Sequence, residues 1–458
     1  MNSLSFDLAS IKSQYDQGAE PVDIIRLALD RIGADGRDDA WISVGVRDSL
    51  EGKARALHAA DRDTLPLWGI PFSVKDNIDA AGFETTAACP QFAYAPQRSA
   101  TVVARLESAG AICIGKTNLD QFATGLNGTR SPYGACGSAF DRNMVAGGSS
   151  SGSAVSVALH QVTFSIGTDT GGSGRIPAGL NNVVGLKPTV GVLSNEGLVP
   201  NCRSLDCPSV FALTVGDAAI VADIMRGANP ADPSLRDRAD EISFSPTLPG
   251  PVRLLAPDAG QREFFGNSEG AALYDAALQT LGSLDLAPQP VDFDPFLEAG
   301  KLVFDGPWIC DRNTSIGTFI SDHPGAVMEP VRQVLSHAER WSGTDTFRAM
   351  ERLRQLRAHV RALLGQDGVL VVPTVAPLYS IAQMQQEPVA RNTHHGHYSY
   401  FVNPLDLCAM AIPAGFYPSG MPFGITLVAP AFADGRLAGL AARIAARFNI
   451  APGKARPC

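Results

Sequence analysis

The chain lacks the features that mark membrane, secreted and nucleic-acid-binding proteins. Among its 458 residues no apolar run reaches the roughly 18 residues that cross a bilayer, and its first residues contain no signal-peptide core. Acidic residues outnumber basic ones by 46 to 37, whereas a nucleic-acid-binding surface needs clustered Lys and Arg. We therefore expect a cytoplasmic protein that binds a small molecule and neither nucleic acid nor a membrane. The sequence is compatible with a homodimer and does not decide the oligomeric state.

Paired metal-ligand motifs are also missing. The eight cysteines are scattered, which is typical of reduced, mostly buried thiols and not of a disulfide framework. Cys202 and Cys207 have no second Cys or His pair nearby, as a tetrahedral zinc site would need. The histidine cluster of His394, His395 and His397 lacks a further ligand type at a regular spacing, so we interpret it as solvated loop residues, with a metal role as the minor alternative. No metal and no cofactor is expected.

Apolar periodicity alternates between helix and strand along the chain. Helical spacing covers residues 22–32, 49–60, 100–110, 152–160, 215–226, 269–281, 344–364 and 435–448, and strand-like runs cover 66–74, 111–115, 162–167, 369–372 and 423–428. The stretch 229–251 is rich in Pro, Asp and Ser and is expected to be a surface loop. Because strands occur on both sides of it without a break in composition, we predict one continuous α/β domain.

Two short turns, 147–153 and 167–173, are dense in serine and glycine. Glycine lets a ligand approach backbone N–H groups, and a serine beside such a turn can act as a nucleophile next to an oxyanion hole. The helix predicted at 152–160 would direct its N-terminus at this site. No histidine adjoins either turn, so the sequence does not support a Ser-His-Asp arrangement here. A nucleophilic serine here would need another base.

Lys75 is the candidate base. It follows the apolar run 66–74 and would end a strand, where burial of its ammonium group would lower the pKa towards neutrality. Taken singly, a Ser/Gly turn also suits phosphate, and a Lys after a strand is usually a surface charge. The two features together favour catalysis.

These segments resemble the amidase signature family. The matching motifs are G-I-P-F-S-V-K-D-N, which contains Lys75, then G-G-S-S, and then G-T-D-x-G-G-S. The resemblance covers nearly the whole chain and implies that Lys75 is the base, that Ser149 is a bridging serine after a cis peptide, and that Ser173 is the nucleophile. The oxyanion would be held by the backbone N–H groups of Thr170, Gly171, Gly172 and Ser173.

The same resemblance implies a fold, namely a single large α/β domain whose central mixed sheet is covered by helices on both faces. In this chain residues 1–62 would form a helical brace, 63–215 the catalytic core, and 216–458 the remainder of the sheet with the substrate-binding segments.

Several segments look like those of one branch of the family, the allophanate hydrolases. They are residues 120–126, Gly174 after the nucleophile, 202–207, 403–409 and 412–416. In that branch a Tyr and an Arg eight residues apart hold the substrate carboxylate. This chain has Phe304 and Arg312 there, so one hydrogen bond to the substrate is missing.

Two further residues are candidates for substrate binding. Gly125 lies in one of the branch-like segments, and Ser150 adjoins the bridging serine. For Arg312 the alternative is a surface ion pair with Asp311 or Asp305.

The resemblance implies an amidohydrolase that releases ammonia from allophanate through an acyl-enzyme. One alternative keeps this chemistry for malonamate, biuret or a generic aliphatic amide. Another is the glutaminase subunit of a tRNA amidotransferase, which the acidic charge balance and the segments within 304–416 disfavour. A catalytically silent binding protein is disfavoured because all three triad positions are retained.

The branch has a second, C-terminal domain, and residues 453–458 fall near where its linker would begin. We therefore expect that domain to be absent from this chain, which is either a piece of a longer protein or works without it.

Overall fold

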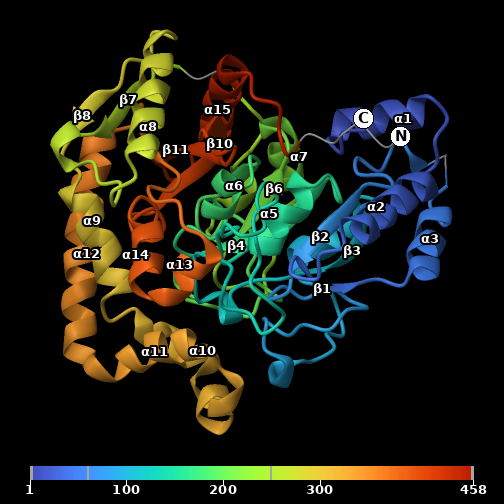
Figure 1. Ribbon diagram of the computed structural model, residues 1–458, viewed down its shortest axis with the longest axis horizontal. Helices are drawn as coiled ribbons and strands as arrows, with labels where there is room; N and C mark the ends of the chain where they lie inside the picture. The colour runs from blue at the N-terminus through green and yellow to red at the C-terminus, as the bar shows by residue number, and fades with distance from the viewer. Residues whose placement is uncertain (1–3, 59–60, 248–249, 455–458) are drawn as a thin grey trace.

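A mixed sheet of eleven strands forms the centre of the computed structural model, which describes residues 4–58, 61–247 and 250–454 (Figure 1). The strands are β1 (Trp41–Val44), β2 (Pro71–Lys75), β3 (Ile112–Thr117), β4 (Phe164–Asp169), β5 (Val184–Lys187), β6 (Cys207–Ala212), β7 (Arg253–Pro257), β8 (Gln289–Val291), β9 (Gly368–Pro373), β10 (Leu407–Phe416) and β11 (Pro422–Pro430). Their order is β1-β3-β2-β4-β6-β5-β10-β11-β9-β7-β8. The neighbours β3, β2 and β4 are parallel, as are β9, β7 and β8, and the remaining pairs are antiparallel.

Helices cover both faces of this sheet. They are α1 (Leu8–Asp16), α2 (Pro21–Asp35), α3 (Arg47–Arg55), α4 (Thr101–Ser108), α5 (Ser151–Ala158), α6 (Ile176–Leu180), α7 (Val215–Met225), α8 (Ser268–Gly282), α9 (Asp294–Phe304), α10 (Ile309–Asp322), α11 (Glu329–Ser336), α12 (Gly343–Leu364), α13 (Ile381–Gln386), α14 (Ala390–Gly396) and α15 (Asp434–Phe448). The helices α9 to α12 lie together at the end of the molecule opposite β1 and β3 (Figure 1).

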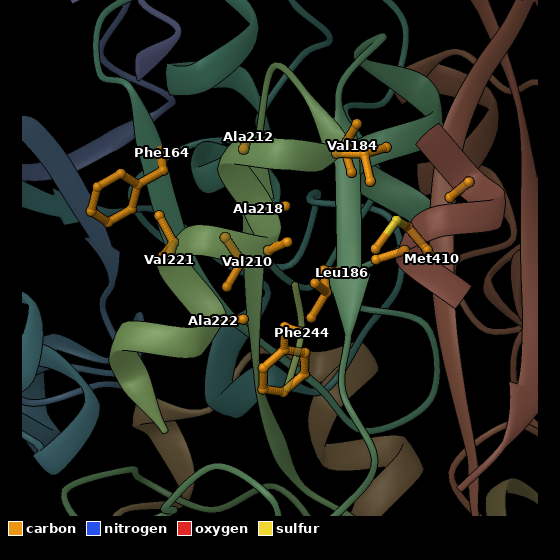
Figure 2. Packing of buried hydrophobic residues seen from close by; sticks show 14 of the residues in the cluster. Phe164, Val184, Leu186, Val210, Ala212, Ala218, Val221, Ala222, Phe244 and Met410 are labelled. Atoms are coloured by element: carbon orange, nitrogen blue, oxygen red, sulfur yellow. The ribbon is translucent and has the colours of Figure 1, made fainter. Parts of the chain in front are cut away.

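Alternation along the strands explains the two covered faces. In β10, Met410 belongs to the core cluster beneath α7 and α15, whereas the neighbouring Ala409, which points to the other side, packs with α9 and α12. Figure 2 shows the first of these faces, where Val221 of α7 lies close to Val210 of β6. Each fully buried Val or Leu in such a layer contributes about 1.5–3 kcal/mol. The predicted α/β domain with helices on both faces is confirmed.

Three parallel strands place the chemistry-bearing residues at one edge of the sheet. β2 lies between β3 and β4, and the carboxyl ends of parallel strands meet at the same edge. Lys75 is the last residue of β2, and Thr168 and Asp169 end β4. The loop that follows β4 carries Ser173, and the turn before α5 carries Ser149. Sheet topology therefore brings the two Ser/Gly turns to the end of the Lys75 strand.

Most predicted elements are present with shifted bounds. The strand predicted at 66–74 begins only at Pro71, and the helix predicted at 49–60 is α3, which ends at Arg55, while residues 59–60 lie outside the described part of the chain. The described part of the loop predicted at 229–251 contains one short 3-10 helix. Residues 248–249 of this loop lie outside the described part of the chain. None of the helices in the described ranges is long and apolar enough to cross a bilayer.

The interpretation of the histidine cluster as solvated loop residues is wrong. His394 and His395 belong to α14, and His397 follows it directly. His395 is 1% exposed, its ring stacks on Tyr379, and burial lowers its pKa to about 4. The His394 ring stacks on Phe265 with 4.1 Å between ring centroids. These rings pack a helix against its surroundings, which the spacing in the sequence did not indicate.

Candidate active site

A continuous hydrogen-bond chain links Lys75, Ser149 and Ser173. Lys75 Nζ lies 2.7 Å from Ser149 Oγ, which lies 2.9 Å from Ser173 Oγ. Lys75 Nζ also donates to Thr168 Oγ1 at 2.8 Å, so the neighbouring parallel strand fixes the orientation of the amine. The peptide bond between Gly148 and Ser149 is cis, as the resemblance implied. The structure thus brings together all three residues of the predicted triad.

The environment of Lys75 favours its neutral form. The side chain is completely buried, and this burial lowers its pKa to about 7, although Asp120, Asp206 and Asp169 act in the opposite direction. In the described residues no carboxylate lies within ion-pair distance of its Nζ. An amine in this setting can exchange a proton with Ser149 near neutral pH.

Asp169 shapes the turn between β4 and Ser173. Its carboxylate forms an ion pair with Arg175 and accepts the backbone N–H groups of Gly172 at 2.9 Å and Gly174 at 3.0 Å. The N–H of Gly172 is therefore occupied, which corrects its predicted place in the oxyanion hole. Elsewhere in the turn, the described part of the chain offers no acceptor to the backbone N–H groups of Thr170, Gly171 and Ser173. These three N–H groups therefore have no acceptor among the described residues.

A pocket opens above Ser173 and is lined by three parts of the chain, within residues 123–130, 170–201 and 304–400. Gly125, Phe304 and Arg312 all line it, as their predicted roles require. Ser150 does not, because its side chain is buried behind the triad and donates to the Thr168 carbonyl at 3.1 Å. Its position supports β4 and leaves it without access to a ligand.

Arg312 has no acidic partner within the described ranges. It projects from α10, is only 8% exposed, and its guanidinium lies 5.7 Å from the centroid of the Phe304 ring. Asp311, offered as the alternative partner, instead accepts hydrogen bonds from Cys202 and Ser204. Neither Asp311 nor Asp305 forms an ion pair with Arg312, so that alternative is wrong for this structure.

A second arginine of the pocket was missed from the sequence. Arg130 is 2% exposed, and it donates to the carbonyl oxygens of Thr124 at 2.9 Å and Pro388 at 2.5 Å while its buried Nε has no partner. Like Arg312, it forms no ion pair with any described carboxylate. Its position just after one of the branch-like segments was the available signal. The pocket therefore holds two buried cations, with Asp305 as an exposed acid at its margin.

Comparison with known proteins gives a consistent result. The sequence profile of the family described as Amidase matches residues 23–438. Urea amidolyase of Saccharomyces cerevisiae is 41% identical over 414 residues, which are 89% of this chain and 22% of that protein. A glutamyl-tRNA(Gln) amidotransferase component of Corynebacterium jeikeium is 30% identical, with 91% of this chain and 90% of that protein covered.

Solved structures also show similarity to this family. The allophanate hydrolase of Kluyveromyces lactis superposes with a TM-score of 0.90 at 38% identity, over 99% of this chain and 74% of that one. The chain spans only about a fifth of the length of the urea amidolyases it matches.

Proposed function

This chain belongs to the amidase family, and we propose that it hydrolyses the terminal amide of a small carboxylated substrate, with allophanate as the first candidate. The observation that carries this proposal is the joining of two features in one pocket. The Lys75–Ser149–Ser173 chain ends at the pocket floor, and Arg312, a buried cation without an acidic partner among the described residues, lies on its wall.

Proton transfer would run along the observed hydrogen bonds. Neutral Lys75 accepts a proton from Ser149, Ser149 accepts one from Ser173, and Ser173 Oγ attacks the amide carbonyl. The relay then reverses and delivers the proton to the leaving nitrogen, so ammonia departs and an ester on Ser173 remains. Water attacks this ester with the same base and releases the carboxylated product.

The oxyanion of the tetrahedral intermediate would lie against the turn after β4. The unoccupied N–H groups of Thr170, Gly171 and Ser173 point to this role, and a donor of this kind is worth about 3–4 kcal/mol in the transition state. Thr170 is held in place because its hydroxyl donates to the buried Asp206 at 2.5 Å. The donors are thus preorganised before the substrate arrives.

The carboxylate at the other end of the substrate would bind Arg312. A guanidinium can hold a carboxylate with two parallel hydrogen bonds, and its burial strengthens the attraction. Arg130 adds positive potential from another segment of the pocket lining. Two buried arginines that form no ion pair with a described carboxylate favour an anionic substrate over a neutral amide.

The test is ammonia release by the purified chain from matched amides. Allophanate and malonamate carry a carboxylate, whereas butyramide and biuret do not, and glutamine tests the alternative of a glutaminase. We expect kcat/KM for the carboxylated amides to exceed that for the neutral ones by at least about 10-fold, from one charge-assisted hydrogen bond. Equal values, or a preference for glutamine, would refute the substrate assignment. No release from any of the five would refute the amidase activity itself.

A further inference from the structure

Tyr400 stands beside Phe304 in the pocket. The two rings stack with 4.0 Å between their centroids and 16° between their planes, and both side chains line the pocket. A glycine supports each ring: a Cβ atom on Gly171 would lie 2.2 Å from Phe304, and one on Gly396 would lie 2.0 Å from Tyr400. The stacked pair is therefore held in a fixed position between two backbone segments.

The tip of the Phe304 ring faces Gly171. The atom nearest to the Cβ position of Gly171 is Cζ, the ring carbon to which a tyrosine hydroxyl would be attached. Phe304 itself carries no hydrogen-bond donor, so a side-chain hydroxyl at this wall has to come from another residue.

The hydrogen-bond partners of Asn392 fix the direction of the Tyr400 hydroxyl bond. Asn392 Oδ1 accepts the backbone N–H of Leu126 at 2.7 Å and the Nδ2 group of Asn127 at 2.8 Å. Its Nδ2 group must then face Tyr400, to whose oxygen it donates at 3.2 Å. The Tyr400 hydroxyl is thus an acceptor in this bond, and its own proton meets no acceptor in the described part of the chain.

The charges around the hydroxyl suit an anionic acceptor. Arg130 and Arg312 both act on Tyr400 electrostatically, with Asp305 opposing them. Burial raises the pKa of Tyr400 to about 12, so the hydroxyl keeps its proton at neutral pH and can donate it.

We propose that the Tyr400 hydroxyl donates a hydrogen bond to the substrate carboxylate beside Arg312, supplying the group that Phe304 lacks. Tyr400 is then a specificity-determining residue for carboxylated amides. This inference rests on the proposed function for the identity of the substrate, but the binding of a carboxylate can be measured without turnover.

The experiment uses Ser173→Ala protein, which keeps the pocket and cannot acylate, with malonate as the probe. Calorimetric titration should give a Kd about 10- to 100-fold higher when Tyr400→Phe is added, as expected for one hydrogen bond to a charged group. Tyr379→Phe is the matched control, because its hydroxyl bonds His394 and lies outside the pocket lining. It should leave the Kd unchanged. An unchanged Kd for Tyr400→Phe, or no malonate binding to Ser173→Ala, overturns the inference.

A merely structural role for Tyr400 would affect all substrates alike, so turnover separates the two roles. In protein with Ser173 intact, Tyr400→Phe should raise KM for malonamate about 10-fold or more, with little change in kcat and no change in kcat/KM for butyramide. Equal losses for both amides would assign Tyr400 to packing. If the parent protein releases no ammonia from any amide, the proposed function fails while the malonate titration still decides the role of Tyr400.

Discussion

The proposed reaction centre and the proposed recognition wall of the pocket are built in different ways. The reaction centre, Lys75, Ser149 and Ser173, lies at the ends of neighbouring parallel strands and in the turns beside them, where backbone geometry positions each side chain. The recognition wall, Phe304, Arg312 and Tyr400, comes from helices and a loop far along the chain, where side-chain stacking and missing ion-pair partners set the geometry. The sheet thus positions the residues of the proposed chemistry, and side-chain packing around it positions those of the proposed substrate recognition.

The largest effect is expected at the nucleophile. Ser173→Ala should lower kcat by at least about 10⁴-fold, because the acyl-enzyme cannot form. Ammonia release measures the loss, and malonate binding checks that the recognition wall persists. Ser156→Ala, a buried serine of α5 outside the triad, should keep activity. A wild-type rate of ammonia release in the Ser173 variant would show that Ser173 is not the nucleophile.

Removal of the base comes next. Lys75→Met keeps an unbranched apolar side chain that ends where the amine would be attached, so kcat should fall about 10³-fold, a typical loss for a general base. Lys12→Met, an exposed lysine of α1, is the control. A rate within about threefold of the parent would mean that another group activates Ser173.

The pH dependence should show the pKa of the same amine. Because the pKa of Lys75 is lowered to about 7, the neutral base dominates above that pH and is lost below it. The rate should therefore fall about tenfold per unit as pH drops below about 7, and level off above it. A profile of kcat/KM for a neutral amide tests this, with circular dichroism to confirm folding. A flat profile from about pH 5 to 8 would contradict the assignment.

At the recognition wall, Arg312→Ala should raise KM for carboxylated amides about 10- to 100-fold and leave neutral amides nearly unaffected. The lost hydrogen bonds involve only the substrate carboxylate. Arg348→Ala removes an exposed arginine of α12 and serves as the control. An equal loss for both kinds of amide would show that the two regions are not separable.

The smallest effect concerns the place where the two regions touch. Gly171→Ala puts a methyl group 2.2 Å from the Phe304 ring, so the ring must shift and the stack with Tyr400 with it. We expect about a tenfold loss in kcat/KM for malonamate. Gly33→Ala in α2 meets no atom within 4 Å and should be harmless or slightly stabilising. Full activity of Gly171→Ala would show that the wall tolerates movement.

The sequence predicted the residues of the reaction centre more completely than those of the recognition wall. The motifs around Lys75, Ser149 and Ser173 resemble those of the amidase signature family, and the structure brings these three residues together. β10 was missed because its run of apolar residues is buried on both faces and cannot be told from a buried helix by periodicity. Tyr400 and Asn392 lie in segments whose spacing carries no such signal, and for Arg130 the only signal was its place just after a branch-like segment.

By itself, the sequence determined the fold class, because helical and strand-like periodicity alternate along it, and it singled out Lys75 and the two Ser/Gly turns, because their motifs resemble those of the amidase signature family. Only the tertiary structure decided that the N–H of Gly172 is occupied by Asp169, that Arg312 forms no ion pair with a described carboxylate and that Tyr400 stacks on Phe304. These facts depend on which side chains come into contact in the folded protein. Contacts between segments that are far apart in the sequence cannot be predicted from the spacing of residues along the chain.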